Sequence, residues 1–151
     1  MLAEVLTVLD APGHSADSVC FGYRGPDGTA EYLLTGDTIL GRGTTVVAHP
    51  DGRLADYLRT LGALGTHIAD RRPQQLLPGH GPVRDDPAAV IEYYRRHRLE
   101  RLAQIRRALA DGSRTPAQVV ARVYADVDRG LWPAAELSVR AQLEYLTGRP
   151  A

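Results

Sequence analysis

The chain of 151 residues, 44% of them hydrophobic, is long enough for one domain or two small ones around a buried core. Its 18 basic and 18 acidic residues cancel, which argues against a general affinity for nucleic acid or anionic membranes, and no lysine is present to form a Schiff base. No apolar run reaches the ~18 residues of a membrane span and no signal peptide is visible, so the sequence predicts a cytoplasmic protein without a membrane partner.

The first part of the chain, residues 1–85, has the pattern of an α/β layer. Short runs rich in Val, Leu, Tyr and Thr predict strands at 4–10, 17–24 and 30–36, and the turn sequence GPDG between the last two predicts a hairpin. The run TTVVAH at 44–49 could form a further short strand.

A helix is expected next, because leucines recur on one helical face, and Gly65 is a plausible end for it. The leucines that define this face are Leu54, Leu58, Leu61 and Leu64. The run PQQLL at 73–77 predicts another strand. The order of strands, helix and strand is typical of an α/β fold.

Residues 86–151 have a helical pattern instead. Asp86 and Pro87 are the residue types that begin a helix, and Thr115 and Gln118 have the spacing of a capping box. The expected helices span about 86–110 and 115–125, and a third begins near Pro133.

Three apolar runs of the first part end in the same way, with a small turn residue followed by a residue that can bind a metal. VLDAPGH ends at His14, EYLLTGD ends at Asp37 and QLLPGH ends at His80. Consecutive strand ends can gather at one edge of a sheet, and glycine beside a ligand leaves room for a metal or substrate. Two imidazoles and one carboxylate suit zinc or a similar ion. The repetition therefore predicts a shared metal site, although each residue alone also fits an ordinary turn.

The other histidines and the single cysteine carry weaker signals. His49 precedes a proline near a helix start, His67 is expected in a linker after Gly65, and His97 is expected on the solvated face of an arginine-rich helix. Cys20 lies in an apolar run, so we expect a buried, inert thiol and no intramolecular disulfide.

The stretches APGHSADSVCF, LLTGDTILGRGTTVV and LLPGHGPV together resemble the later metal motifs of the metallo-β-lactamase superfamily of hydrolases. The last two are most similar to the β-lactamase-like subgroup that has a C-terminal winged-helix-like domain. The resemblance implies an α/β fold. By this resemblance, residues 1–85 would form the C-terminal half of an αβ/βα sandwich, and residues 86–151 would form a small all-α winged-helix-like domain.

The resemblance also implies roles for the three predicted ligands. His14 would ligate the first of two divalent ions, usually zinc, Asp37 would bridge both ions, and His80 would ligate the second. A hydroxide between the ions would attack a carbonyl or phosphoryl centre. The family's first motif, His-x-His-x-Asp-His, is absent. The chain is therefore expected to be a C-terminal portion that binds zinc weakly or not at all without an N-terminal half.

The resemblance leaves the substrate open among small-molecule esters, thioesters and lactams, or RNA. Two other functions stay open as well. The last helix, with Arg140 and Gln142 exposed, could bind nucleic acid, and the sheet left uncovered could form a homodimer that retains relic metal residues.

Overall fold

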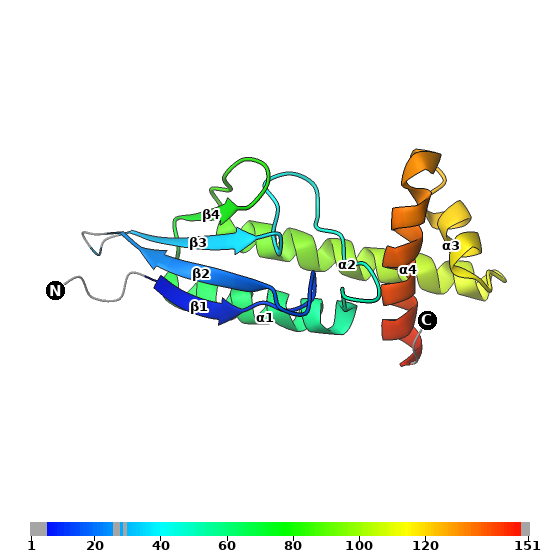
Figure 1. Ribbon diagram of the computed structural model, residues 1–151, viewed down its shortest axis with the longest axis horizontal. Coiled ribbons are helices and arrows are strands. Elements are labelled where there is room, and N and C mark those ends of the chain that lie inside the picture. Colours follow the sequence, from blue (N-terminus) through cyan, green and yellow to red (C-terminus); the bar gives the residue numbers. More distant parts are fainter. Residues whose placement is uncertain (1–5, 26–27, 29, 149–151) are drawn as a thin grey trace.

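The computed structural model describes residues 6–25, 28 and 30–148 (Figure 1). Its strands are β1 (Leu6–Asp10), β2 (Val19–Arg24), β3 (Glu31–Gly36) and β4 (Gln75–Pro78). Its helices are α1 (Leu54–Arg71), α2 (Pro87–Ala110), α3 (Pro116–Val123), the short 3-10 helix η1 (Arg129–Leu131) and α4 (Trp132–Thr147). Residues 4 and 5 of the first predicted strand, and 26 and 27 of the predicted hairpin turn, lie outside the described residues.

The four strands form one mixed sheet in the order β1-β2-β3-β4. β2 pairs antiparallel with β1 and with β3, which confirms the predicted hairpin, whereas β4 pairs parallel to β3. β1, β3 and β4 therefore run in the same direction, and their carboxyl ends meet at one edge of the sheet. Figure 1 shows this edge facing the end of the molecule that carries α4.

One face of the sheet packs against α1 and α2 (Figure 1). Side chains alternate along each strand, so Cys20, Leu33 and Leu76 point toward the helices and are fully buried. The opposite face carries a row of paired residues across all four strands, formed by Val8, Phe21, Leu34 and Leu77. Val8 is 62% exposed, and no helix of the described residues covers this face.

A second core lies at the other end of α2. It joins the last turns of α2 to α3 and α4, and its buried members are Ile105, Ala108, Val119, Val120 and Val139. The capping box predicted from Thr115 and Gln118 is present, as is the Asp86 cap on α2. Because α2 also contributes Val90, Ile91, Tyr94 and Leu102 to the first core, one continuous helix connects the two cores.

The predicted end of α1 at Gly65 is wrong, since the helix continues to Arg71. Leu64 and Ile68 are both buried on its inner face, and this packing outweighs the low helix propensity of glycine. Arg72, the residue after the helix, is its C-terminal cap, because its φ is 52° and its N–H donates to the Ile68 carbonyl.

The strand considered for 44–49 is also wrong, because this segment pairs with no strand. Hydrogen bonds from other parts of the fold hold its backbone instead. For example, the His49 N–H donates to the Leu137 carbonyl of α4 at 3.2 Å.

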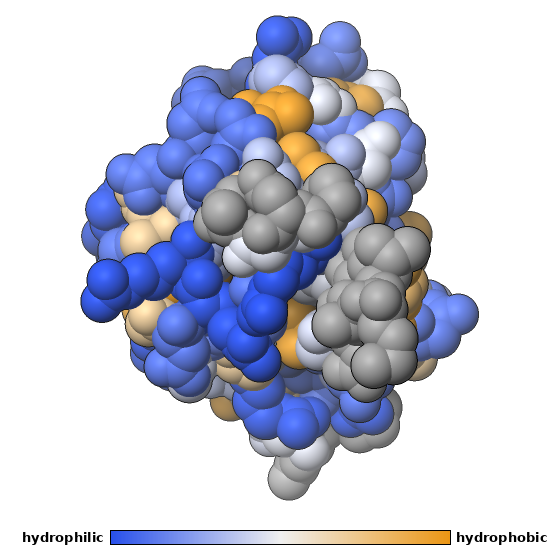
Figure 2. Space-filling view, turned by 90° about the vertical axis from the view of Figure 1, so that its left-hand side faces the viewer, coloured by the Kyte–Doolittle hydropathy of each residue, from blue (hydrophilic) through white to orange (hydrophobic). Residues whose placement is uncertain are grey.

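Most of the described residues visible at the end of the molecule opposite the carboxyl edge of the sheet are hydrophilic. Figure 2 looks onto this end, and hydrophobic side chains are scattered among polar ones there. None of the helices within the described residues has both the length and the apolar character needed to cross a membrane.

Candidate functional site

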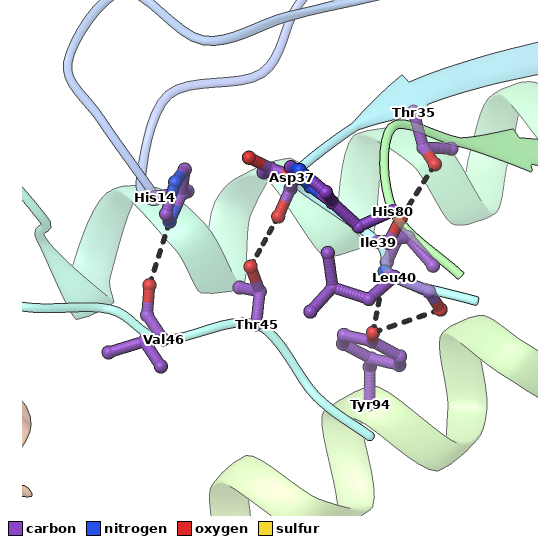
Figure 3. Close-up of polar contacts among 9 residues, drawn as sticks. All are labelled: His14, Thr35, Asp37, Ile39, Leu40, Thr45, Val46, His80 and Tyr94. Carbon is purple, nitrogen blue, oxygen red and sulfur yellow. Dashed lines mark hydrogen bonds and ion pairs between the residues drawn. The ribbon is translucent and has the colours of Figure 1, made fainter. Parts of the chain in front are cut away.

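The three predicted ligands all lie at the carboxyl edge of the sheet (Figure 3). Asp37 follows β3 directly, His80 follows β4 by two residues, and His14 stands in the loop after β1. The strand directions explain this convergence, since segments 23 and 43 residues apart reach the same edge only if their strands run in parallel.

Asp37 and His80 touch directly. Nδ1 of His80 lies 2.5 Å from Oδ1 of Asp37, so the ring nitrogen donates to the carboxylate. The His80 side chain is 76% exposed and that of Asp37 is 36% exposed. The contact leaves Nε2 of His80 and the second oxygen of Asp37 available to an ion or a substrate.

The ring of His14 is held by the backbone of a neighbouring segment. Its Nδ1 lies 2.8 Å from the Val46 carbonyl oxygen, and because a carbonyl only accepts, Nδ1 carries the proton. The lone pair of Nε2 is then free, which is the arrangement that metal-binding histidines use.

The loop that carries His14 lies tightly against the start of α1. The Arg53 N–H donates to the Gly13 carbonyl at 3.0 Å, and the Thr60 hydroxyl donates to the Pro12 carbonyl at 2.7 Å. A Cβ at Gly13, where φ is 138°, would lie only 2.4 Å from Cα of Tyr57. Only glycine allows this approach, so the position next to His14 is fixed by the helix beneath it.

The loop after Asp37 is held from below by two buried tyrosines. The Tyr57 hydroxyl donates to the Thr38 carbonyl at 2.7 Å, and the Leu40 N–H donates to the Tyr94 oxygen at 2.8 Å. Burial raises the pKa of both phenols, so each stays neutral and serves as a structural hydrogen-bonding group.

The donor atoms at this edge suit zinc in type but not in number. Imidazole nitrogen and carboxylate oxygen are ordinary zinc ligands, and a catalytic site uses three protein ligands for each ion. Within residues 6–25, 28 and 30–148, no three His, Cys, Asp or Glu side chains lie close enough to hold one ion together. The described residues alone therefore do not complete a zinc site of this kind, and the ligand roles of His14, Asp37 and His80 remain predictions.

The predicted surroundings of His67 and His97 are both wrong. His67 lies inside α1 rather than in a linker, with Nε2 3.4 Å from Oε1 of Glu31. His97 is half-buried rather than on a solvated face, and burial, with Arg98 and Arg101 nearby, lowers its pKa. Neither residue lies in the loops after β1, β3 and β4 that carry the predicted ligands.

The single cysteine is buried, as predicted. Cys20 is fully inaccessible, and burial raises its pKa to about 11, so it stays a protonated thiol.

Sequence reasoning missed Arg98, which is 5% exposed and donates from Nη2 to the Thr45 carbonyl. A signal for it was present, because Arg98 falls four residues after Tyr94 and four before Leu102 on the buried stripe of α2. The arginine-rich surroundings concealed this periodicity.

A large groove of the fold lies away from this edge. It has a volume of about 710 Å³ and runs between the end of α1 and the start of α2, where its lining includes Ile68, Arg72, Ile91 and Arg95. None of the three predicted ligands lines it. None of the described histidines lines the groove, so it does not combine imidazole and carboxylate groups as the converging loops do.

The prediction that Gln142 is exposed on a recognition helix is wrong. Gln142 is 3% exposed, and its Nε2 donates to the Ser138 carbonyl at 3.0 Å within α4. Arg140 forms an ion pair with Glu136 at 2.9 Å. This surface gives no support to an RNA partner.

Comparison with known proteins gives consistent results. Residues 115–149 match the family described as beta-lactamase associated winged helix domain. The Beta-lactamase-like protein 2 homolog of Drosophila melanogaster is 37% identical over 142 residues, which cover 92% of this chain and 44% of the relative. An atrochrysone carboxyl ACP thioesterase of Aspergillus chevalieri is 33% identical, over 81% of this chain and 38% of the relative. A crystal structure of a metallo-beta-lactamase family protein from Thermus thermophilus has a TM-score of 0.75 and 27% identity, covering 95% of this chain and 44% of that one.

This chain thus spans less than half the length of these relatives. The structural match extends through nearly all of it, from the sheet to the helices after α2. The chain belongs to the metallo-β-lactamase superfamily, and its fold is the C-terminal half of that α/β sandwich followed by the associated winged-helix domain.

Proposed function

We propose that this chain carries part of the dinuclear metal centre of a hydrolase, with His14, Asp37 and His80 as its ligands. The observation that supports this most is their convergence at one sheet edge, where His80 contacts Asp37 at 2.5 Å and Nε2 of His14 is left free. Both side chains are exposed in part, so their contact adds little to the buried core.

Each ligand has a role that suits its chemistry. Asp37 would bridge two ions with the carboxylate oxygen that His80 leaves free, whereas each neutral imidazole would bind one ion through one nitrogen. When bound, zinc would supply an activated hydroxide and stabilise negative charge on the substrate. The remaining ligands would come from polypeptide beyond the described residues, because no three donors gather among them.

The substrate class that we propose is a small molecule with a reactive carbonyl, such as an ester, a thioester or a lactam. The support is the naming of relatives, one of which is a thioesterase and another a beta-lactamase-like protein. A nucleic-acid substrate has no comparable support.

Zinc titration of the 151-residue chain by calorimetry tests the ligand set. His80→Ala and Asp37→Asn are expected to weaken zinc binding by at least about tenfold, because each removes a direct ligand. His49→Ala serves as the matched control, since this histidine is not one of the proposed ligands. Equal affinities in all four proteins would refute the assignment, whereas no zinc binding by the unmodified chain would show that these residues hold no ion without the remaining ligands.

A further inference from the structure

Two adjacent residues connect the loops that carry His14 and Asp37. The Thr45 hydroxyl donates to the Asp37 carbonyl, and the Val46 carbonyl accepts from Nδ1 of His14 at 2.8 Å. Figure 3 shows Thr45 and Val46 on one segment that passes close to both predicted ligands. We call these two residues the strap. It holds the backbone of Asp37 and the ring of His14, which lie in loops after different strands.

The strap is itself held from the opposite side by Arg98 of α2. Nη2 of Arg98 donates to the Thr45 carbonyl, and the guanidinium lies 5.0 Å from the centre of the Tyr57 ring. The hydroxyl of Tyr57 in turn donates to the Thr38 carbonyl, one residue after Asp37. Arg98 and Tyr57 thus support both ends of the segment between Asp37 and the strap.

Packing alone does not account for a guanidinium at this position. Arg98 is 5% exposed, it forms no ion pair with any acidic residue that the structure describes, and its buried Nε has no hydrogen-bond partner. A buried charge without a counter-charge destabilises a fold, so a long neutral side chain would fit there at lower cost. What the guanidinium adds is a directed donor to the Thr45 carbonyl.

We propose that Arg98 is a positioning residue for the metal-binding edge. By holding the Thr45 carbonyl it fixes the strap, and the strap keeps the Asp37 loop and the Nδ1-protonated ring of His14 in the orientation that ligands need. This role rests on the proposed function, but its structural part can be measured without metal.

The primary test is the tautomer of His14 in the metal-free chain, read from two-bond ¹⁵N–¹H couplings of its imidazole. The unmodified chain is expected to show a single tautomer with the proton on Nδ1. Arg98→Met is expected to give a mixture of tautomers, and Arg98→Lys, which keeps a donor, is expected to restore part of the original signal. Arg106→Met, an exposed position on the same helix, is the control and is expected to change nothing.

A measurement on the unmodified chain covers the case in which Arg98→Met does not fold. If the Thr45 carbonyl holds the guanidinium, the Nη hydrogens of Arg98 give separate, slowly exchanging signals. Averaged signals from a freely rotating guanidinium would overturn the proposal without any variant.

Zinc affinity separates this proposal from the function on which it rests. Arg98→Met is expected to weaken zinc binding about tenfold or more, as loss of an orienting group does in other metal sites. If zinc binding and the His14 tautomer are both unchanged in Arg98→Met, the positioning role is refuted while the metal site stands. If His80→Ala and Asp37→Asn bind zinc as tightly as the unmodified chain but the tautomer changes as expected in Arg98→Met, the positioning role stands and the proposed function fails.

Discussion

Single residues at the carboxyl edge are constrained mainly by their backbone neighbours. Gly13 is the clearest example, because its Cβ position is occupied by the backbone of Tyr57 at 2.4 Å and its φ is 138°.

Gly13→Ala is therefore expected to lower the free energy of unfolding by about 2 kcal/mol or more, through both overlap and backbone strain. Gly112→Ala is the control, since Gly112 also has a positive φ of 100° but nothing lies within 4 Å of its Cβ position. Its free energy of unfolding should fall by only ~1 kcal/mol, because this substitution adds backbone strain without an overlap. Urea denaturation followed by circular dichroism measures both, and equal losses would show that the contact with α1 does not matter.

A second residue-scale prediction concerns pH. Burial, with Arg98 and Arg101 nearby, lowers the pKa of His97, so the folded state disfavours its protonated form. The stability that depends on neutral His97 is fully present above the ordinary pKa of about 6.5 and is lost as pH falls below it.

Between about pH 7.5 and pH 5, the unmodified chain should therefore lose more stability than His97→Gln. Urea unfolding at several pH values measures this difference, and the other histidines cancel because both proteins share them. Parallel pH profiles would contradict the prediction.

Among the elements, α3 depends most on its cap, since it is the shortest α-helix described. The Thr115 hydroxyl accepts from the Gln118 N–H at 3.2 Å, and the Gln118 side chain accepts from the Thr115 N–H at 3.2 Å.

Thr115→Ala is expected to destabilise the chain by about 1 kcal/mol, the usual effect of losing an N-cap. Thr66→Ala, at an exposed position inside α1, is the control and should change stability by no more than about 0.5 kcal/mol. Thermal unfolding compares the two, and an equal small change would mean that α3 does not need its cap.

Local sequence signals predicted most of these elements. The caps at Asp86 and Thr115 and the strand-rich runs are decided by neighbouring residues, so they are readable without the fold. The predicted end at Gly65 was wrong because buried packing of Leu64 and Ile68 carries the helix past it. The prediction of a strand at 44–49 was wrong because hydrogen bonds from distant residues, including Arg98, hold the backbone of this segment.

The convergence of the candidate ligands could be expected from the sequence, but their geometry could not. The repeated turn pattern singled out His14, Asp37 and His80, whose ligand roles remain predictions, and the mixed sheet explains why they share an edge. The direct contact of Asp37 with His80 and the role of the Val46 carbonyl depend on loop positions 43 and 32 residues apart, which no local pattern encodes.

At the scale of the whole molecule, α2 joins the core under the sheet to the core of the helical end. Leu146 of α4 packs against both cores, and Ala141 is buried in the first. We expect the two cores to unfold together, because neither can lose its part of α2 alone.

The single tryptophan, Trp132, packs against the helical core and reports on it alone, whereas far-ultraviolet circular dichroism reports on all elements. Urea transitions followed by the two signals should coincide. A tryptophan transition at a clearly different urea concentration would show that the predicted domains, residues 1–85 and 86–151, unfold separately.

The common direction of β1, β3 and β4 also determines where this chain can be tethered. The connection between α1 and β4 lies at the end where β1, β3 and β4 begin, about 20 Å from the ligand edge by the length of β3. A dye or an affinity tag joined there would leave the opposite edge open to solution. Immobilised through that end, the chain would present His14, Asp37 and His80 to metal ions or to a complementary polypeptide.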